Sequence, residues 1–198
     1  MRNCLVIDLD RCSGCDSCVV ACKYAHGLDL GVCWNRVQQM ESGTFPDVEQ
    51  YWLPRQCQQC EDAPCLNVCP TGATYREDTY GIVIVDEEAC IGCQLCMTAC
   101  PYGARRFDED KNVVEKCDCC IDRLKKGEQP ACVHNCCTGA RFFGDLDDPD
   151  SDVAKAVAAA GEENCHRLPD NGDANPRTVY ILHASTAAWI DALKDFSL

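Results

Sequence analysis

Two short apolar runs hold corresponding places in the chain and predict two strands. Residues 5–12 (LVIDLDRC) and 82–90 (IVIVDEEAC) each place aliphatic residues ahead of an acidic turn and a cysteine. Runs of this kind are typical of short strands that end at a turn. The sequence therefore predicts a repeated unit made of a strand, a cysteine-rich loop and a short helix that carries the last cysteine.

The hydrophobic pattern also predicts two hairpins and a tail of different composition after residue 144. In the first hairpin, Ser42-Gly43 and Pro46-Asp47 supply the turn residues. In the tail, residues 147–151 read as the N-terminal cap of a helix that ends at Gly161. The expected elements are hairpin strands at 36–40 and 48–53, hairpin strands at 104–108 and 113–116, a helix at 153–160, a strand at 178–182 and a helix at 185–194.

Composition excludes several classes of protein. Of the 198 residues, 21 are cysteine, and because this count is odd they cannot all pair in disulfides within one chain. The chain opens without the cationic and apolar segments of a secretory signal. Its formal net charge of −14 disfavours binding to nucleic acid phosphate, and no apolar run reaches the roughly 20 residues of a membrane span. We therefore expect no nucleic-acid partner and no direct membrane span.

Sixteen cysteines form four groups of four, and each group ends in the spacing C-x3-C. The third group, C-x2-C-x2-C-x3-C followed by proline, has the spacing of bacterial ferredoxins. The second and fourth groups have longer spacers, and the residues after the last cysteine recur as PTGATY, PYGARRF and CTGARFF. In chain order the groups are Cys12, Cys15, Cys18 and Cys22; Cys57, Cys60, Cys65 and Cys69; Cys90, Cys93, Cys96 and Cys100; Cys117, Cys120, Cys132 and Cys136.

This spacing favours iron–sulfur clusters over zinc. Three thiolates on one tight loop suit a [4Fe–4S] core, whereas structural zinc sites draw on pairs of cysteines. The fourth group alone also fits a zinc site, so a zinc-bound structural or interaction module stays open as an alternative. No nucleophilic triad or paired-carboxylate motif is present, so we expect no catalytic site. The remaining cysteines are expected to be small buried hydrophobic residues: Cys4, Cys33, Cys119, Cys137 and Cys165.

Two pairings of the four groups satisfy the ligand rule of two-cluster ferredoxins. In those proteins the last cysteine of one group binds the cluster that the partner group holds. The first pairing is nested and joins group one with group four and group two with group three. The second is sequential and joins group one with two and group three with four. The spacing alone leaves both open.

The four groups, their longer spacers and the segment FGDLDDPDS at 143–151 resemble one family. Its members are the four-cluster electron-transfer subunits of the dimethyl sulfoxide reductase family of molybdenum or tungsten bis-pterin oxidoreductases. The resemblance extends over about residues 5–182. With the elements above, it implies an α+β fold of two nested bacterial-ferredoxin-like modules, a hairpin insertion and a C-terminal helical and strand tail. The expected boundaries are 1–27 with 109–144 for one module, 55–108 for the other, 28–54 for the insertion and 145–198 for the tail.

The resemblance favours the nested pairing and implies four [4Fe–4S] clusters, because all sixteen ligand positions are cysteine. Lys23 and Cys137 stand where proline is usual after the last cysteine, and we expect both to tune a cluster, as we do for Lys116. We name the expected ligand sets a to d. Set a is Cys12, Cys15, Cys18 and Cys136; set b is Cys22, Cys117, Cys120 and Cys132; set c is Cys57, Cys60, Cys65 and Cys100; set d is Cys69, Cys90, Cys93 and Cys96.

The implied function is the relay of single electrons to or from a large molybdenum or tungsten bis-pterin catalytic subunit. A membrane-anchor, quinone-linked subunit or a soluble redox donor would be the other partner. The alternative is a stand-alone polyferredoxin, or an electron carrier linked to hydrogenase or formate dehydrogenase. Two locations stay open: the cytoplasm, or the outer face of the cytoplasmic membrane after export with a partner that carries a twin-arginine signal.

Overall fold

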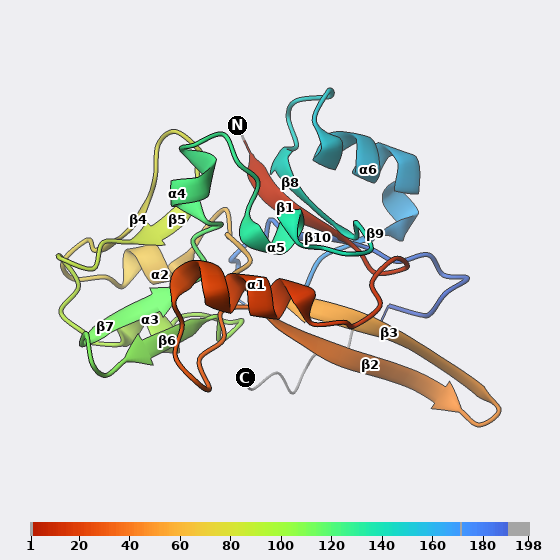
Figure 1. The fold of residues 1–198 in the computed structure, drawn as a ribbon, viewed down its shortest axis with the longest axis horizontal. Helices are drawn as coiled ribbons and strands as arrows, with labels where there is room; N and C mark the ends of the chain where they lie inside the picture. Colours follow the sequence, from red (N-terminus) through yellow and green to blue (C-terminus); the bar gives the residue numbers. More distant parts are fainter. Residues whose placement is uncertain (1, 171, 190–198) are drawn as a thin grey trace.

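Short helices and small sheets surround the cysteine groups in a mixed α+β fold (Figure 1). The computed structural model describes residues 2–170 and 172–189. Its four-stranded sheet has the order β8, β1, β10, β9. β1 runs antiparallel to β8 and parallel to β10, which in turn runs antiparallel to β9. The bounds are Asn3–Asp8 for β1, Arg141–Asp145 for β8, Cys165–His166 for β9 and Val179–Ile181 for β10.

Alternate residues of β1 face two different cores. Val6 is fully buried in a core that includes Val153 of helix α6 (Asp152–Ala160). Ile7, the next residue along, is buried in the core that includes Cys60. Because successive strand side chains point to opposite faces, β1 has α6 on one side and the cysteine-rich body on the other. The strand predicted at the start of the chain therefore lies between α6 and the core that includes Cys60.

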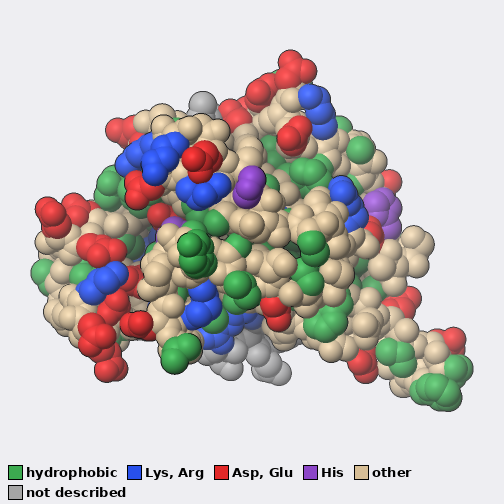
Figure 2. All heavy atoms as spheres, viewed as in Figure 1, with side chains coloured by type: hydrophobic (Ala, Val, Ile, Leu, Met, Phe, Trp, Pro, Cys, Tyr) green, Lys and Arg blue, Asp and Glu red, His purple; other side chains and the backbone are tan. Residues whose placement is uncertain are grey.

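Both predicted hairpins are confirmed. β2 (Arg36–Thr44) pairs with β3 (Asp47–Arg55), and β6 (Arg105–Asp108) pairs with β7 (Val113–Lys116). The β2–β3 hairpin projects from the body, and apolar side chains gather at its far end in Figure 2, where Phe45 and Val48 are exposed. A shorter pair joins β4 (Thr74–Arg76) to β5 (Val83–Val85), the strand predicted at the third cysteine group.

Short helices carry many of the cysteines and pack in two pairs. α1 packs against α5, which brings the first and fourth cysteine groups together, and α2 packs against α3, which does the same for the second and third groups. α4 follows the C-x2-C loop of the fourth group. The bounds are Ser17–His26 for α1, Pro64–Asn67 for α2, Leu95–Thr98 for α3, Ile121–Leu124 for α4 and Ala131–His134 for α5.

The region after residue 144 is built into the sheet. The predicted helix at 153–160 is confirmed as α6, and its cap Ser151 accepts a hydrogen bond from the Ala154 amide at 3.1 Å. A 3-10 turn, η1 (Glu162–Asn164), leads to β9, and the predicted strand at 178–182 is the central strand β10. The helix predicted at 185–194 is wrong where it can be compared, because residues 185–189 hold a turn and no helix; its remainder lies outside the described residues. None of the described helices has the length and apolar character needed to cross a membrane.

Candidate metal centres

The C-x2-C loops of all four cysteine groups share one backbone geometry. In each loop the residue just before the second cysteine has a positive φ, a region that L side chains rarely adopt. Its recurrence at one place in four loops indicates a common loop shape, which extends to the fourth group. In the fourth group this positive-φ residue is Cys119, which lies in the loop between Cys117 and Cys120. The φ values are 66° at Gly14, 49° at Gln59, 68° at Gly92 and 55° at Cys119.

The thiols expected in set a range from exposed to buried: Cys15 is exposed, Cys12 and Cys136 are half-buried, and Cys18 is buried. Burial, with the nearby thiols of Cys18 and Cys136, raises the pKa of Cys12. Cys15 is exposed, and hydrogen bonds from the Ser17 backbone and from Cys137 lower its pKa to about 7. A lowered pKa favours the thiolate, which is the form that binds metal.

The thiols expected in set b are all buried. The pKa of Cys22 is raised first by burial and then by the thiols of Cys117, Cys132 and Cys120. Burial and neighbouring thiols also raise the pKa of Cys120 and Cys132, whereas a hydrogen bond with Cys119 lowers that of Cys117. Four buried thiols side by side form a poor site for negative charge unless a cation joins them. The arrangement is therefore suited to a metal centre.

His26 joins this set, which the sequence did not predict. Its Nε2 atom lies 3.2 Å from the Cys120 Sγ atom and 3.6 Å from the Asp118 carboxylate. His26 and Cys120 are 94 positions apart in the chain, and His26 ends α1 without any metal-binding motif beside it. Only the packing of α1 beside the fourth group brings them together.

The thiols of the second and third groups gather in the other half of the molecule. Burial, followed by the thiols of Cys57, Cys100 and Cys65, raises the pKa of Cys60. The four cysteines expected in set d line one cavity, whose walls also include Val85 and Val114. Those four are Cys69, Cys90, Cys93 and Cys96.

Thiols of neighbouring sets lie close to one another in the order a, b, c, d. One thiol pair links a to b, another links b to c, and a third links c to d, because in each pair the charge of one thiol acts on the pKa of the other. The pairs are Cys18 with Cys132, Cys57 with Cys117, and Cys65 with Cys96.

Three buried cations lie between these sets. Arg141 acts on Cys132 and Cys18, Lys116 on Cys57 and Cys117, and Arg105 on Cys96 and Cys65. Burial disfavours the charge of both arginines, but the adjacent thiols raise the pKa of each. All three side chains are almost fully buried, with Arg105 2% exposed, Lys116 3% and Arg141 3%.

The donor groups around the thiols fit an iron–sulfur cluster. The buried Nε atoms of Arg105 and Arg141 have no hydrogen-bond partner within the described residues, although a buried charged donor needs one. A [4Fe–4S] cluster supplies irons for the thiolates and sulfides that accept N–H groups. The residues present therefore fit the cofactor that the cysteine spacing implies.

The recurring segment after the last cysteine aims a backbone amide at its sulfur. The Ala140 amide lies 3.2 Å from the Cys136 Sγ atom, and the Ala104 amide lies 3.5 Å from that of Cys100. The Thr74 amide lies 3.5 Å from the sulfur of Cys69. A hydrogen bond of this kind stabilises the thiolate, which explains why the segment recurs.

Two expectations about residues beside the groups are corrected. Cys137 was expected to be buried, yet it is exposed and its Sγ atom lies 3.4 Å from that of Cys15. Lys23 was expected to act on a cluster, but its ammonium group donates to the backbone carbonyls of Asp29 and Val32. Lys23 therefore fastens the loop after α1.

Comparisons with known proteins agree with this chemistry. The model of a 4Fe-4S dicluster domain matches residues 48–146, and that of a 4Fe-4S binding domain matches residues 9–25. These matches favour iron–sulfur clusters over a zinc-bound module.

Similar curated proteins cover most of the chain. The B subunit of sulfite dehydrogenase from Allochromatium vinosum is 40% identical over 94% of this chain and 85% of its own length. The iron-sulfur B subunit of a putative dimethyl sulfoxide reductase from Halobacterium salinarum is 42% identical over 89% and 78%. The B subunit of tetrathionate reductase from Salmonella typhimurium is 39% identical over 91% and 72%. The chain therefore belongs to the family of 4Fe–4S electron-transfer subunits of molybdopterin oxidoreductases.

Proposed function

We propose that the chain holds four [4Fe–4S] clusters, one in each of the sets a to d, within two nested ferredoxin-like modules. The carrying observation is the proximity of the thiols, since Cys22 lies among three thiols of the fourth group and Cys100 acts on Cys57 and Cys60 of the second. The pairing of α1 with α5 and of α2 with α3 supports the same nesting.

Electrons would pass along the sets in the order a, b, c, d. Sets a and d each include an exposed cysteine, Cys15 and Cys93, while all cysteines of set b are buried. Each cluster, when bound, takes up or gives up one electron at a time. The protein holds the irons, offsets their ligands' charge with Arg141, Lys116 and Arg105, and leaves the two terminal sets open to redox partners.

The catalytic partner would be a molybdenum or tungsten bis-pterin subunit at one terminal set. The other end would exchange electrons with a membrane-anchor subunit or a soluble redox protein. Relatives named as B subunits of sulfite dehydrogenase and of tetrathionate reductase support the first part. Co-purification of the tagged chain with a pterin-containing chain tests it, and recovery of an iron-loaded chain that never associates with such a partner would contradict it.

Single cysteine variants test the nested pairing. Cys100→Ser and Cys60→Ser should change the same electron paramagnetic resonance signal, because both residues belong to set c. Cys117→Ser should change a different signal, that of set b. The sequential pairing predicts instead that Cys100→Ser and Cys117→Ser alter one signal, so this outcome would overturn the nested pairing.

A further inference from the structure

The base of the β2–β3 hairpin carries two arginines in direct opposition. Arg36 on β2 is the cross-strand partner of Arg55 on β3. Like charges directly opposite each other destabilise a strand pair. The chain carries 18 basic against 32 acidic residues, so acidic neighbours are abundant elsewhere. Arg55 is buried and donates to the Gln38 side chain at 3.5 Å, whereas Arg36 is exposed.

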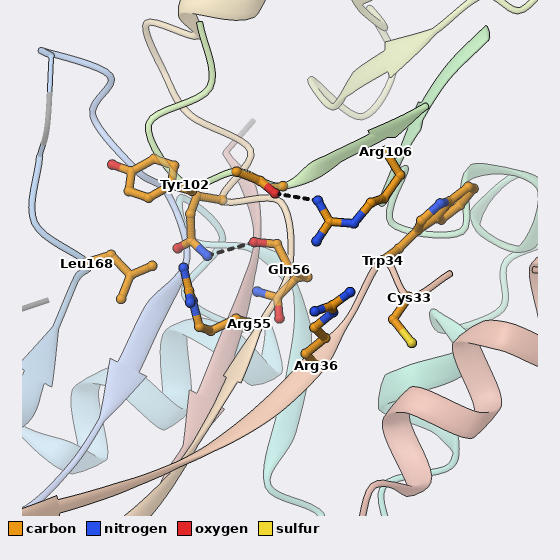
Figure 3. Close-up of a pocket in the computed structure, with 11 residues that line it drawn as sticks. Cys33, Trp34, Arg36, Arg55, Gln56, Tyr102, Arg106 and Leu168 are labelled. Carbon is orange, nitrogen blue, oxygen red and sulfur yellow. Dashed lines mark hydrogen bonds between the residues drawn. The ribbon is translucent and has the colours of Figure 1, made fainter. Parts of the chain in front are cut away.

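A third arginine joins this pair around one pocket (Figure 3). Arg106 from β6 lines the pocket with Arg36 and Arg55, and none of the lining side chains is acidic. Figure 3 shows Arg36 and Arg106 directed toward each other across the middle, with Arg55 on the side of Leu168. Within residues 2–170 and 172–189, Arg106 donates to the backbone carbonyls of Gly103 and of its own neighbour Arg105. Among the described residues, no hydrogen bond or ion pair holds the Arg36 side chain.

The same pocket has buried N–H donors without acceptors. The Trp34 Nε1 atom and the Gln56 Nε2 atom have no hydrogen-bond partner in the described part of the chain. Gln56 is only 5% exposed. Its side-chain oxygen accepts a hydrogen bond from Arg141 at 2.8 Å, so the unpaired atom of the amide is the nitrogen. The Gln58 oxygen is an unpaired acceptor at the wall. With the guanidinium groups of Arg36 and Arg106 and two unpaired N–H donors, the pocket is suited to an anion.

The size of the pocket favours a carboxylate. The pocket has a cavity volume of about 20 Å³, close to what one or two waters need. Arg36 is exposed at its edge and Arg106 is half-buried, so the anion can enter from the surface. A carboxylate at the end of a side chain fits this space and matches the planar guanidinium fork.

We propose that this arginine pocket, formed by Arg36, Arg55 and Arg106, receives an aspartate or glutamate side chain of the catalytic partner subunit. The inference rests on the proposed function, since it requires such a partner. A chain of net charge −14 repels acidic proteins, and a local basic pocket gives an acidic partner one favoured orientation. The pocket orients the partner and takes no part in electron transfer.

The test compares binding with stability. In the complex with the pterin-containing subunit, Arg36→Gln and Arg106→Gln should each weaken association at least about tenfold. Arg2→Gln is the matched control, because it removes only the surface ion pair with Asp147 and should leave association unchanged. In the free iron-loaded chain, Arg36→Gln should keep the melting temperature, because Arg36 is exposed and no other described residue forms a hydrogen bond or ion pair with its side chain.

Four outcomes would overturn the inference. Unchanged association of the Arg36 and Arg106 variants would refute it while leaving the proposed function intact, and absence of any wild-type complex would remove the function on which it rests. Stabilisation of the free chain by acetate or sulfate, dependent on Arg36 but without an effect on association, would identify a small-anion site. A chain ending at Trp189 that associates more tightly than wild type would indicate that its own Asp191 or Asp195 fills the pocket.

Discussion

The Sγ atom of Cys137 lies 3.4 Å from the Sγ atom of Cys15, so an extra thiol contacts the exposed cysteine of set a. The contact lowers the pKa of Cys15. Because Cys15 would be a thiolate when it binds iron, the Cys137 thiol is then the group that can donate. Proline at this position would have no such donor. Set a, the exposed end of the proposed relay, therefore has a side-chain hydrogen bond that can shift its reduction potential.

Removal of that thiol should lower the reduction potential of set a. A hydrogen bond to a ligand sulfur stabilises the more negative, reduced state, so Cys137→Ala is expected to lower the potential by about 20–60 mV. Cys137→Ser keeps a donor and should shift it less. Redox titration followed by electron paramagnetic resonance measures both, with Cys165→Ala as the control thiol outside the sets. Equal potentials in Cys137→Ala and wild type would contradict this role.

The buried arginines should be needed for cluster retention. Arg141→Gln keeps much of the side-chain volume but leaves the anionic sets a and b without their shared cation, which costs about 3–5 kcal/mol in a buried pair. We expect iron per chain to fall by the content of one or two clusters and the melting temperature to drop. Lys155→Gln, an exposed lysine on α6, is the control. Full iron content in Arg141→Gln would show that the cation is dispensable.

Gly14 should tolerate no side chain, for two separable reasons. Its φ is +66°, and a methyl group there would overlap the Trp52 ring of β3. Gly127 has a φ of +74° with open space around it, so Gly127→Ala should cost only the backbone term of about 1–2 kcal/mol. Gly14→Ala should cost about 1–3 kcal/mol more in urea unfolding. In a Trp52→Ala background the extra cost should vanish, and its persistence would rule out the ring overlap.

An ion pair between the C-terminal segment and the first cysteine loop should make stability depend on pH. The hydrogen bond to Asp10 raises the pKa of His183, and although burial opposes the charge on Asp10, bonds from Thr186 and His183 hold its pKa below the ordinary value. The stabilisation is therefore full below the unfolded imidazole pKa of about 6.5 and fades as pH rises through the raised folded value. It also fades as pH falls through the lowered pKa of Asp10.

The melting temperature of His183→Gln relative to wild type measures this effect. The difference should be largest between about pH 4 and 6.5 and should shrink on both sides of that window. A difference that stays constant from pH 4 to pH 9 would show that the ion pair does not contribute.

Local patterns predicted the elements well, because turn residues and alternation act within a few positions. Both hairpins and α6 with its Ser151 cap illustrate this. The strand pairing of β1 with β10 was out of reach, since alternation identifies a buried face but not the strand beside it. β9 has only two residues, too short for any periodic signal.

The candidate site, too, was predictable from the sequence only in part. The cysteines stand out because the four of each group lie close in sequence, and the matched 4Fe-4S family models cover the segments that contain them. His26 could not be found beside Cys120, because that contact depends on how α1 packs against the fourth group. The position of Arg105 and Arg141 after the recurring Gly-Ala pair was a usable signal, since both occupy the same place in the repeat.

The most direct test of the account is the number of irons and electrons that one anaerobically purified chain carries. Four [4Fe–4S] clusters predict about 16 irons and 16 sulfides per chain, and uptake of about four electrons in coulometric reduction. Zinc in place of iron, or about eight irons with about two electrons, would contradict the proposal that all four cysteine sets hold clusters.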